Sequence, residues 1–198
     1  MAQPVLHELR SILEPVAMDA LFASSAPLEI ELGSGDGSFL AALAAARPAR
    51  NFIGIERLLG RARKLERKAR RLDLKNLRVI RIESAYFLRY LVPRHAAAAI
   101  HVYFPDPWPK RKHRRHRLIN EDFPAIAAGA LAPGGTVHLR TDDADYFDQM
   151  QRVFASAAPA FVPAETPAEL AAILTDFERG FQSKGIGTHR ASYRLVSH

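Results

Sequence analysis

The strongest constraint on the fold is an apolar segment that runs into a glycine-rich turn and then into a helical pattern. Residues 28–32 predict a short strand, and residues 33–37, Gly-Ser-Gly-Asp-Gly, predict a tight turn. Residues 38–46 then predict a helix with Ser38 near its N-cap. Glycines let a backbone turn sharply and come close to a ligand. This succession is typical of the first unit of a nucleotide-binding α/β sheet.

The same alternation continues along the chain. Further strands are predicted at residues 51–55, 77–82, 96–104, 136–139 and 161–162, with a last, antiparallel strand at 187–195. Helices are predicted between them, at residues 57–72, 85–91, 117–131, 146–156 and 167–181. We therefore expect an α/β fold with a doubly wound, mostly parallel seven-stranded sheet. It would form a domain at residues 28–198, after an N-terminal extension at residues 1–27.

Composition excludes several classes of protein. Residues 1–26 contain His7, Glu8, Arg10, Glu14 and Asp19, so they lack the uninterrupted apolar region of a signal peptide. No apolar run approaches the roughly 18 residues of a membrane span. Without cysteine there is neither a disulfide nor a thiolate metal site. We expect a cytoplasmic protein that binds no membrane and no metal.

Positive charge is concentrated in two segments. The net charge is +7, yet residues 57–81 hold 11 Lys/Arg against two acids, and residues 110–117 hold six cations and no acid. The rest of the chain is therefore acidic. This distribution is the electrostatic pattern of a polyanion binder. Phosphate contacts are expected from Arg61, Lys64, Lys68, Arg71 and residues 111–117.

A proline-rich loop precedes the second basic segment. Pro105, Pro107 and Pro109 fix their own φ angles and push residues 104, 106 and 108 toward extended conformations. The expected result is a stiff, non-helical loop after a buried strand. It would hold one carboxylate, Asp106, in a set position.

The run Asp106-Pro107-Trp108-Pro109-Lys110, followed by basic residues and Arg117-Leu118, resembles the signature of the bacterial tRNA (guanine-N7-)-methyltransferases. The resemblance covers most of the chain, roughly residues 28–195. It implies a Rossmann-like class I fold that uses S-adenosylmethionine. It also implies methyl transfer to N7 of a guanosine in tRNA, at position 46 of the variable loop. The chain is expected to act on tRNA as a monomer or a homodimer.

The residues around the glycine turn favour S-adenosylmethionine over a dinucleotide. A dinucleotide site needs a glycine where this chain has Ser38, and Glu31 and Asp36 would repel a pyrophosphate. The same acids could pair with the ammonium group of a methionine moiety. Glu56 follows Gly35 by 21 residues, where an acid typically accepts hydrogen bonds from ribose hydroxyls.

Five predicted strands deliver polar residues to the edge at which such sheets bind their ligands. The cofactor site is expected to comprise Glu31, Gly33, Gly35, Gly37, Glu56, Ser84 and Asp106, with Asp106 also as the catalytic residue. Ser84 replaces the acid or amide that the family usually has for the adenine amine, so either Ser84 or Glu83 could make that contact. The resemblance assigns the RNA substrate to Lys110, Asp142, Thr175, Asp176, Phe177 and Glu178.

The chemistry of guanine limits what these residues must do. N7 carries a free lone pair, so its methylation needs no strong general base and depends on positioning and electrostatics. Asp106 is expected to favour the shift of positive charge onto the purine. We expect Glu178 or Asp142 to accept the two donors of the Watson–Crick edge, and Lys110 to donate to O6.

Three other functions stay open. A methyltransferase for a small molecule or a protein would leave the basic segments unexplained. A non-catalytic RNA-binding protein is favoured only by Ser84, and a dinucleotide oxidoreductase is disfavoured by Ser38 and the nearby acids. The histidines show no metal spacing and are expected at the surface or facing RNA: His95, His101, His113, His116, His138 and His189.

Overall fold

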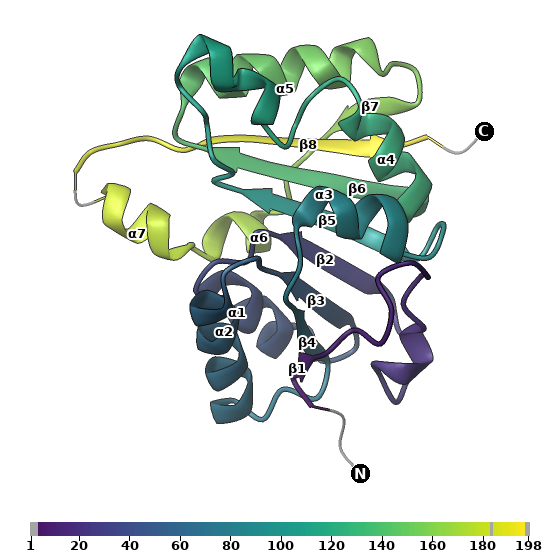
Figure 1. The fold of residues 1–198 in the computed structure, drawn as a ribbon. Coiled ribbons are helices and arrows are strands. Elements are labelled where there is room, and N and C mark those ends of the chain that lie inside the picture. Colours follow the sequence, from purple (N-terminus) through teal and green to yellow (C-terminus); the bar gives the residue numbers. More distant parts are fainter. Residues whose placement is uncertain (1–3, 183, 197–198) are drawn as a thin grey trace.

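The computed structural model describes residues 4–182 and 184–196 of the chain. Its centre is one eight-stranded sheet in the order β1-β4-β3-β2-β5-β6-β8-β7 (Figure 1). β8 runs antiparallel to both neighbours and all other pairs are parallel, which confirms the predicted sheet. The strands are β1 (Leu6–His7), β2 (Leu28–Leu32), β3 (Asn51–Ile55), β4 (Leu77–Ile80), β5 (Ala97–Tyr103), β6 (Leu131–Thr141), β7 (Phe161–Ala164) and β8 (His189–Leu195).

The sheet has eight strands instead of the predicted seven because the N-terminal segment adds one. Leu6 and His7 pair in parallel with Val79 and Ile80 of β4, at the edge of the sheet. A strand of two residues leaves no periodic pattern in a sequence, so the alternation could not predict it.

Helices cover both faces of the sheet, as predicted (Figure 1). One face packs against α1 (Ser38–Ala46), α2 (Leu59–Arg71) and α6 (Ala168–Ala172). The other face packs against α3 (Ser84–Tyr86) with the π-helical turn Phe87–Leu91, α4 (Phe123–Ala130) and α5 (Ala144–Ser156). Figure 1 shows α7 (Asp176–Gln182) beyond the carboxyl ends of the central strands.

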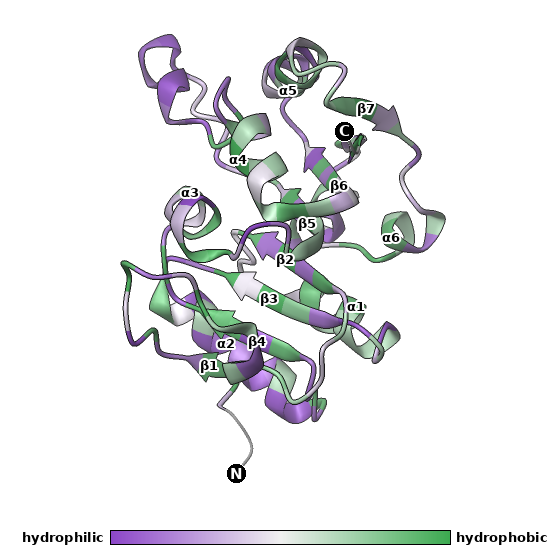
Figure 2. Cartoon of the chain, turned by 90° about the vertical axis from the view of Figure 1, so that its right-hand side faces the viewer, coloured by the Kyte–Doolittle hydropathy of each residue, from purple (hydrophilic) through white to green (hydrophobic). Residues whose placement is uncertain are grey.

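The helices α1 and α2 lie on the same face but differ in polarity. Figure 2 shows α1 mostly in green and α2 mostly in purple. α2 buries only the narrow stripe of Ala62, Leu65 and Ala69, and most of its cations are exposed. Leu58 and Leu72 flank the helix and are exposed.

Two predicted helices are shorter than expected. The helix predicted at residues 117–131 begins only at Phe123, and Leu131 already belongs to β6. Residues 133–135, Pro-Gly-Gly, lie within β6. A strand tolerates them there because they fall in an irregularity: the register with β5 shifts between Leu131 and Thr136, and pairing with β8 begins only at Thr136. The helix predicted at residues 167–181 is divided into α6 and α7. In the described part of the chain, no helix is long and apolar enough to cross a membrane.

Candidate active site

The candidate site lies where the strand order reverses. From β2 the chain moves outward through β3 and β4, and β5 then returns to the other side of β2. Open α/β sheets bind ligands outside the carboxyl ends of their strands at such a switch. Glu31 of β2 and Asp106 after β5 lie on its two sides, and Glu56, Ser84 and Asp142 follow β3, β4 and β6. The fold thus brings these five predicted residues to one edge.

Three glycines shape the turn after β2. Gly33, Gly35 and Gly37 have φ angles of 76°, 56° and 75°. A Cβ on Gly37 would lie 2.3 Å from the Leu65 side chain of α2, so a larger residue would force the turn and the helix apart. Gly37 itself is the N-cap of α1, and the predicted cap residue, Ser38, is already helical.

Glu31 is a buried carboxylate with an unused acceptor. It is 3% exposed, and its Oε2 has no hydrogen-bond partner among the described residues. Burial raises the pKa of Glu31 well above its usual value; Arg140 opposes this shift, while Asp36 and Glu56 reinforce it. A cationic ligand group would supply both the missing donor and the missing counter-charge.

Asp36, the acid inside the glycine turn, is engaged within the protein. Its carboxylate accepts hydrogen bonds from the N–H and the hydroxyl of Ser38, at 3.0 and 2.7 Å, and pairs with Lys68 of α2. Burial alone would raise the pKa of Asp36, but these donors lower it. Asp36 and Lys68 thus neutralise each other in this structure, and the contacts expected of Asp36 with a methionine ammonium group and of Lys68 with a phosphate stay predictions.

Glu56 connects the glycine turn to α2. Its carboxylate accepts hydrogen bonds from the Gly35 N–H at 3.0 Å and the Leu58 N–H at 2.8 Å. A carboxylate has about four acceptor positions, so two backbone donors leave room for ribose hydroxyls. The geometry is compatible with the expected ribose contact.

The two candidates for the adenine contact differ in availability. The Glu83 carboxylate caps α3 by accepting hydrogen bonds from the N–H groups of Ala85 and Tyr86, at 2.9 and 2.7 Å. The half-buried Ser84 hydroxyl makes no hydrogen bond to any described residue. The structure therefore favours Ser84 over Glu83 for a ligand contact.

The proline-rich loop is irregular as predicted, but two of its residues are not extended. Phe104 and Trp108 have φ angles of 51° and 43°, which are uncommon for side-chain-bearing residues. The Phe104 N–H donates to the Arg140 carbonyl at 2.8 Å, and the Trp108 N–H donates to Oδ1 of Asp106 at 3.0 Å. These bonds hold the two strained residues, and the Asp106 side chain stays exposed.

Arg117 fastens this loop to the body of the protein. It is 1% exposed, and it donates to the Pro107 carbonyl at 2.7 Å, to Gln149 at 2.8 Å and to Asp145 at 2.6 Å. Its guanidinium also lies over the Tyr146 ring, 4.6 Å from the centroid. The expectation that Arg117 contacts phosphate is wrong, because its side chain is buried and its guanidinium donates to these partners within the protein.

The remaining cations of the second basic segment are more accessible. Arg111–His116 forms a 3-10 helix in which His113 and His116 flank the Trp108 ring. Arg114 pairs with Asp145 at 3.0 Å. The exposed cations around this helix are Lys110, Arg111, Lys112 and Arg115.

Thr175 and Glu178 form a capping box that starts α7. The Thr175 N–H donates to Glu178 Oε2 at 2.9 Å, and the Glu178 N–H donates back to the Thr175 hydroxyl at 3.1 Å. The Glu178 carboxylate also pairs with Arg140 at 2.8 Å and with Arg190 at 2.7 Å. Glu178 is 1% exposed, so its role here is to hold α7 against β6 and β8. The spacing Thr-x-x-Glu was visible in the sequence and could have predicted this cap.

Three of the residues expected at the RNA substrate are exposed near this cap. Phe177 is 49% exposed, and its ring lies 5.9 Å from that of Phe104. Asp176 and Asp142 are exposed as well, whereas the neighbouring Asp143 caps α5 through the Tyr146 N–H. Of the two acids considered for the guanine edge, Asp142 is accessible and Glu178 is not.

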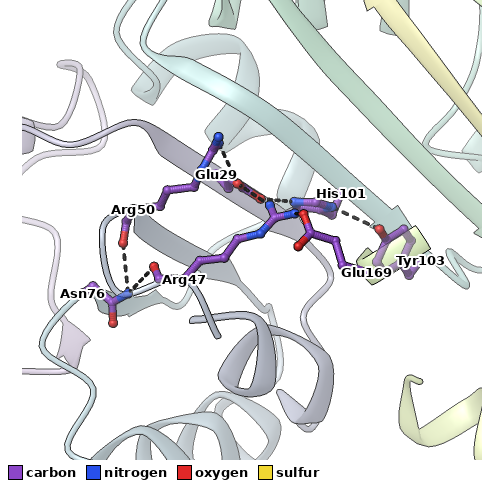
Figure 3. A network of polar contacts seen from close by, with 7 residues as sticks. All are labelled: Glu29, Arg47, Arg50, Asn76, His101, Tyr103 and Glu169. Atoms are coloured by element: carbon purple, nitrogen blue, oxygen red, sulfur yellow. Dashed lines mark hydrogen bonds and ion pairs between the residues drawn. The ribbon is translucent and has the colours of Figure 1, made fainter. Parts of the chain in front are cut away.

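A buried polar network lies behind the site, on the α1 face of the sheet (Figure 3). His101 bonds to Glu29 through Nε2 at 2.8 Å and to the Tyr103 hydroxyl through Nδ1 at 3.0 Å. Arg47 and Arg50 also pair with Glu29, at 2.8 and 2.9 Å. Burial alone would raise the pKa of Glu29, but His101 and the two arginines lower it to about 2.

Two histidines expected at the surface are instead buried. His101 and His138 are 0% and 6% exposed, and their rings stack 5.2 Å apart. Burial lowers the pKa of His101, and it lowers that of His138 to about 3, so both are neutral near pH 7. Neutral His101 donates a hydrogen bond from Nε2–H to Glu29 and accepts one at Nδ1 from the Tyr103 hydroxyl. Among the described residues, no group of acids and histidines has the arrangement of a metal site.

Comparisons of sequence relate the chain to one family of enzymes. Residues 25–191 match the family model described as "Putative methyltransferase". The tRNA (guanine-N(7)-)-methyltransferase of Halorhodospira halophila is 35% identical over 91% of the chain and 80% of its own length. The protein of the same name from Methylococcus capsulatus is 39% identical over 88% and 78%. The one from Bordetella pertussis is 38% identical, but the match covers 55% of its length.

Solved structures with this fold include more distant methyltransferases. The 16S rRNA methyltransferase KamB superimposes with a TM-score of 0.66 at 16% identity, over 91% of this chain and 93% of that one. Geranyl diphosphate C-methyltransferase from Streptomyces coelicolor, solved with S-adenosyl-L-homocysteine, has a TM-score of 0.57 at 16% identity over 90% and 73%. At such low identity these matches establish the class I methyltransferase fold alone.

Proposed function

The chain belongs to the tRNA (guanine-N(7)-)-methyltransferase family, and we propose that it transfers the methyl group of S-adenosylmethionine to N7 of a guanosine in tRNA. The proposed target is position 46 of the variable loop. One observation carries the proposal: the carboxyl edge of the sheet joins an unpaired buried carboxylate, Glu31, to the exposed acid of the signature loop, Asp106.

The residues around the glycine turn suit S-adenosylmethionine. The unused Oε2 of Glu31 would accept the ammonium group of the methionine moiety. Glu56 would accept the ribose hydroxyls, and Ser84 would contact the adenine. The turn at Gly33, Gly35 and Gly37 leaves backbone close to the bound ligand. When bound, S-adenosylmethionine supplies a methyl group activated by its positively charged sulfur.

The exposed residues at the rim would recognise guanine. The Watson–Crick edge of guanine presents two donors, N1–H and the exocyclic amine, which one carboxylate can accept together. Asp142 would take this role, because it is exposed while the Glu178 carboxylate already accepts hydrogen bonds from three donors. Lys110 would donate to O6, which adenine lacks. An adenine would leave the carboxylate facing an acceptor, and this mismatch is costly.

The protein contributes positioning and charge to the reaction. N7 attacks with a lone pair that needs no deprotonation, so no residue acts as a general base. Asp106, held by the Trp108 N–H and by the Arg117 anchor of its loop, would stabilise the positive charge as it moves to the purine. The exposed cations of α2 and of the segment 110–115 would bind phosphates of the tRNA.

A methyl-transfer assay with labelled S-adenosylmethionine and unmodified tRNA tests the proposal. We expect 7-methylguanosine in the digested product, its loss in Asp106→Ala, and its retention in the control Asp148→Ala, an exposed acid of α5. Label at another nucleoside would contradict the assignment of the target. Binding of the donor without transfer to RNA would support the cofactor site and overturn the proposed substrate.

A further inference from the structure

A cavity lies at the opposite edge of the sheet from the candidate active site. It has a volume of about 630 Å³ and lies between the N-terminal segment and the end of α2. The N-terminal segment contributes Phe22 and Asp19, the end of α2 contributes Arg70, and Lys75 and Arg78 come from the connection to β4 and from β4 itself. Arg78 is the second residue of β4, which places it at the amino end of that strand.

Arg78 is a buried cation without a carboxylate partner. It is 6% exposed, and its guanidinium lies 5.2 Å from the centre of the Phe22 ring. Its Nη1 donates to the carbonyls of Lys75 and Leu77, at 3.0 and 2.8 Å, and its Nε has no partner. None of the ion pairs among the described residues includes Arg78. Desolvation of a charge that is not compensated is unfavourable, and burial accordingly lowers the pKa of Arg78.

The acids near the cavity do not neutralise Arg78. Asp73 lines the cavity but pairs with Lys75, and Arg70 on the same rim pairs with Glu66. Asp19 is exposed. The cavity therefore offers one buried guanidinium with charged donors at its rim, a combination that suits an anion with several acceptor oxygens, such as a phosphate.

The basic face of α2 connects this cavity to the candidate active site. α2 starts after β3, at the carboxyl edge, and its 13 residues span about 20 Å toward the opposite edge. Several exposed cations along it pair with no described carboxylate: Arg61, Arg63, Lys64, Arg67 and Arg71. A single nucleoside could not extend over this distance, whereas a folded RNA could.

We propose that the Arg78 cavity, beside the C-terminal end of α2, binds a backbone phosphate of the tRNA. The inference rests on the proposed function in that tRNA is the partner. It adds a second, distant contact that positions the RNA and takes no part in the chemistry. The phosphate of a small molecule could satisfy the same groups, and the experiment separates these two sources.

The test measures tRNA affinity as a function of salt concentration for the full chain and three variants. Arg78→Met removes the buried cation, and Lys75→Gln changes only the exposed rim, so it keeps the test valid if Arg78→Met folds poorly. Arg152→Gln, an exposed cation on α5, is the matched control for charge. We expect both cavity variants to weaken tRNA binding severalfold, and Arg78→Met to lower the slope of log K against log salt by about one.

At saturating tRNA, the rate of methyl transfer and the affinity for S-adenosylmethionine should match those of the unmodified protein. Cavity variants that bind tRNA like Arg152→Gln would overturn the proposal. So would thermal stabilisation by inorganic phosphate that is lost in Arg78→Met while tRNA affinity is unchanged, because the site would then bind a small phosphate compound. tRNA affinity is measured separately from methyl transfer. Failure to form 7-methylguanosine would therefore contradict the proposed function and leave the conclusion about the Arg78 cavity unchanged.

Discussion

Two buried carboxylates at the same edge of the sheet, Glu31 and Glu178, are used in opposite ways. Both are almost inaccessible, at 3% and 1% exposed. Glu178 accepts hydrogen bonds from two arginines and a backbone N–H, whereas Glu31 has an oxygen with no partner among the described residues. Burial alone would raise the pKa of both carboxyl groups. The donors around Glu178 outweigh the effect of burial and lower the pKa of Glu178, whereas the pKa of Glu31 stays well above its usual value.

One of these carboxylates stabilises the fold, and the other is available to bind a ligand. A buried ion pair that loses one partner leaves an uncompensated charge, so Glu178 fixes α7 and Arg140 in place. An unpaired buried acid destabilises the protein without ligand, and a bound cation relieves that cost. Glu178 is thus part of the framework, and Glu31 is part of the proposed binding site.

The largest expected effect is that of Glu178→Gln on stability. Loss of the carboxylate leaves Arg140, which is 1% exposed, without a counter-charge, and the expected loss is about 3–5 kcal/mol of unfolding free energy. Denaturant unfolding measures it. Asp176→Asn, an exposed acid in the first turn of the same helix, is the control and should cost less than about 1 kcal/mol. Equal losses in the two variants would contradict the framework role of Glu178.

A second test uses pH. A rise in pH increases the stability that a paired acid contributes and decreases the stability of a protein that buries an unpaired acid. The pKa of Glu29 is lowered from 4.5 to about 2, so its contribution is present above pH 4.5 and is lost as the pH falls toward 2. It amounts to about 3 kcal/mol. The pKa of Glu31 is raised, so Glu31 destabilises the protein without ligand as the pH rises above 4.5.

Unfolding of Glu29→Gln and Glu31→Gln between pH 3 and 7 measures this contrast. The stability deficit of Glu29→Gln should narrow as the pH falls, and Glu31→Gln should gain stability relative to the unmodified protein as the pH rises. Parallel stability curves for both variants and the unmodified protein would contradict the assignment.

A smaller effect is expected at the anchor of the signature loop. Arg117→Lys keeps the charge but cannot reproduce three separate donor contacts to Pro107, Gln149 and Asp145. We expect kcat/KM for tRNA to fall about tenfold, with the affinity for S-adenosylmethionine unchanged, because the Asp106 loop loses its fixed position. The exposed Arg115→Lys is the control. A tenfold loss in both variants would show that loop position is not the cause.

The sequence predicted the parts of this molecule that depend on local pattern. The glycine turn, the strand that contains Glu31, the strand before Asp106 and the antiparallel last strand all follow from periodicity and from Gly and Pro positions. Ion pairs between segments that are distant in the sequence could not be predicted from such local patterns. Lys68 lies 32 residues from Asp36, and Arg140 lies 38 residues from Glu178, so only the folded chain shows that these charges neutralise one another.

Glu31→Gln tests directly whether the buried Glu31 carboxylate serves a ligand, through its effects on ligand affinity and on stability. Calorimetric titration with S-adenosylmethionine should show affinity reduced about 10- to 100-fold, because a charge-assisted hydrogen bond is lost. The unfolding free energy of the ligand-free protein should stay the same or rise. Unchanged affinity, or a loss of stability as large as that of Glu178→Gln, would show that the buried Glu31 carboxylate does not bind a cationic group of the ligand.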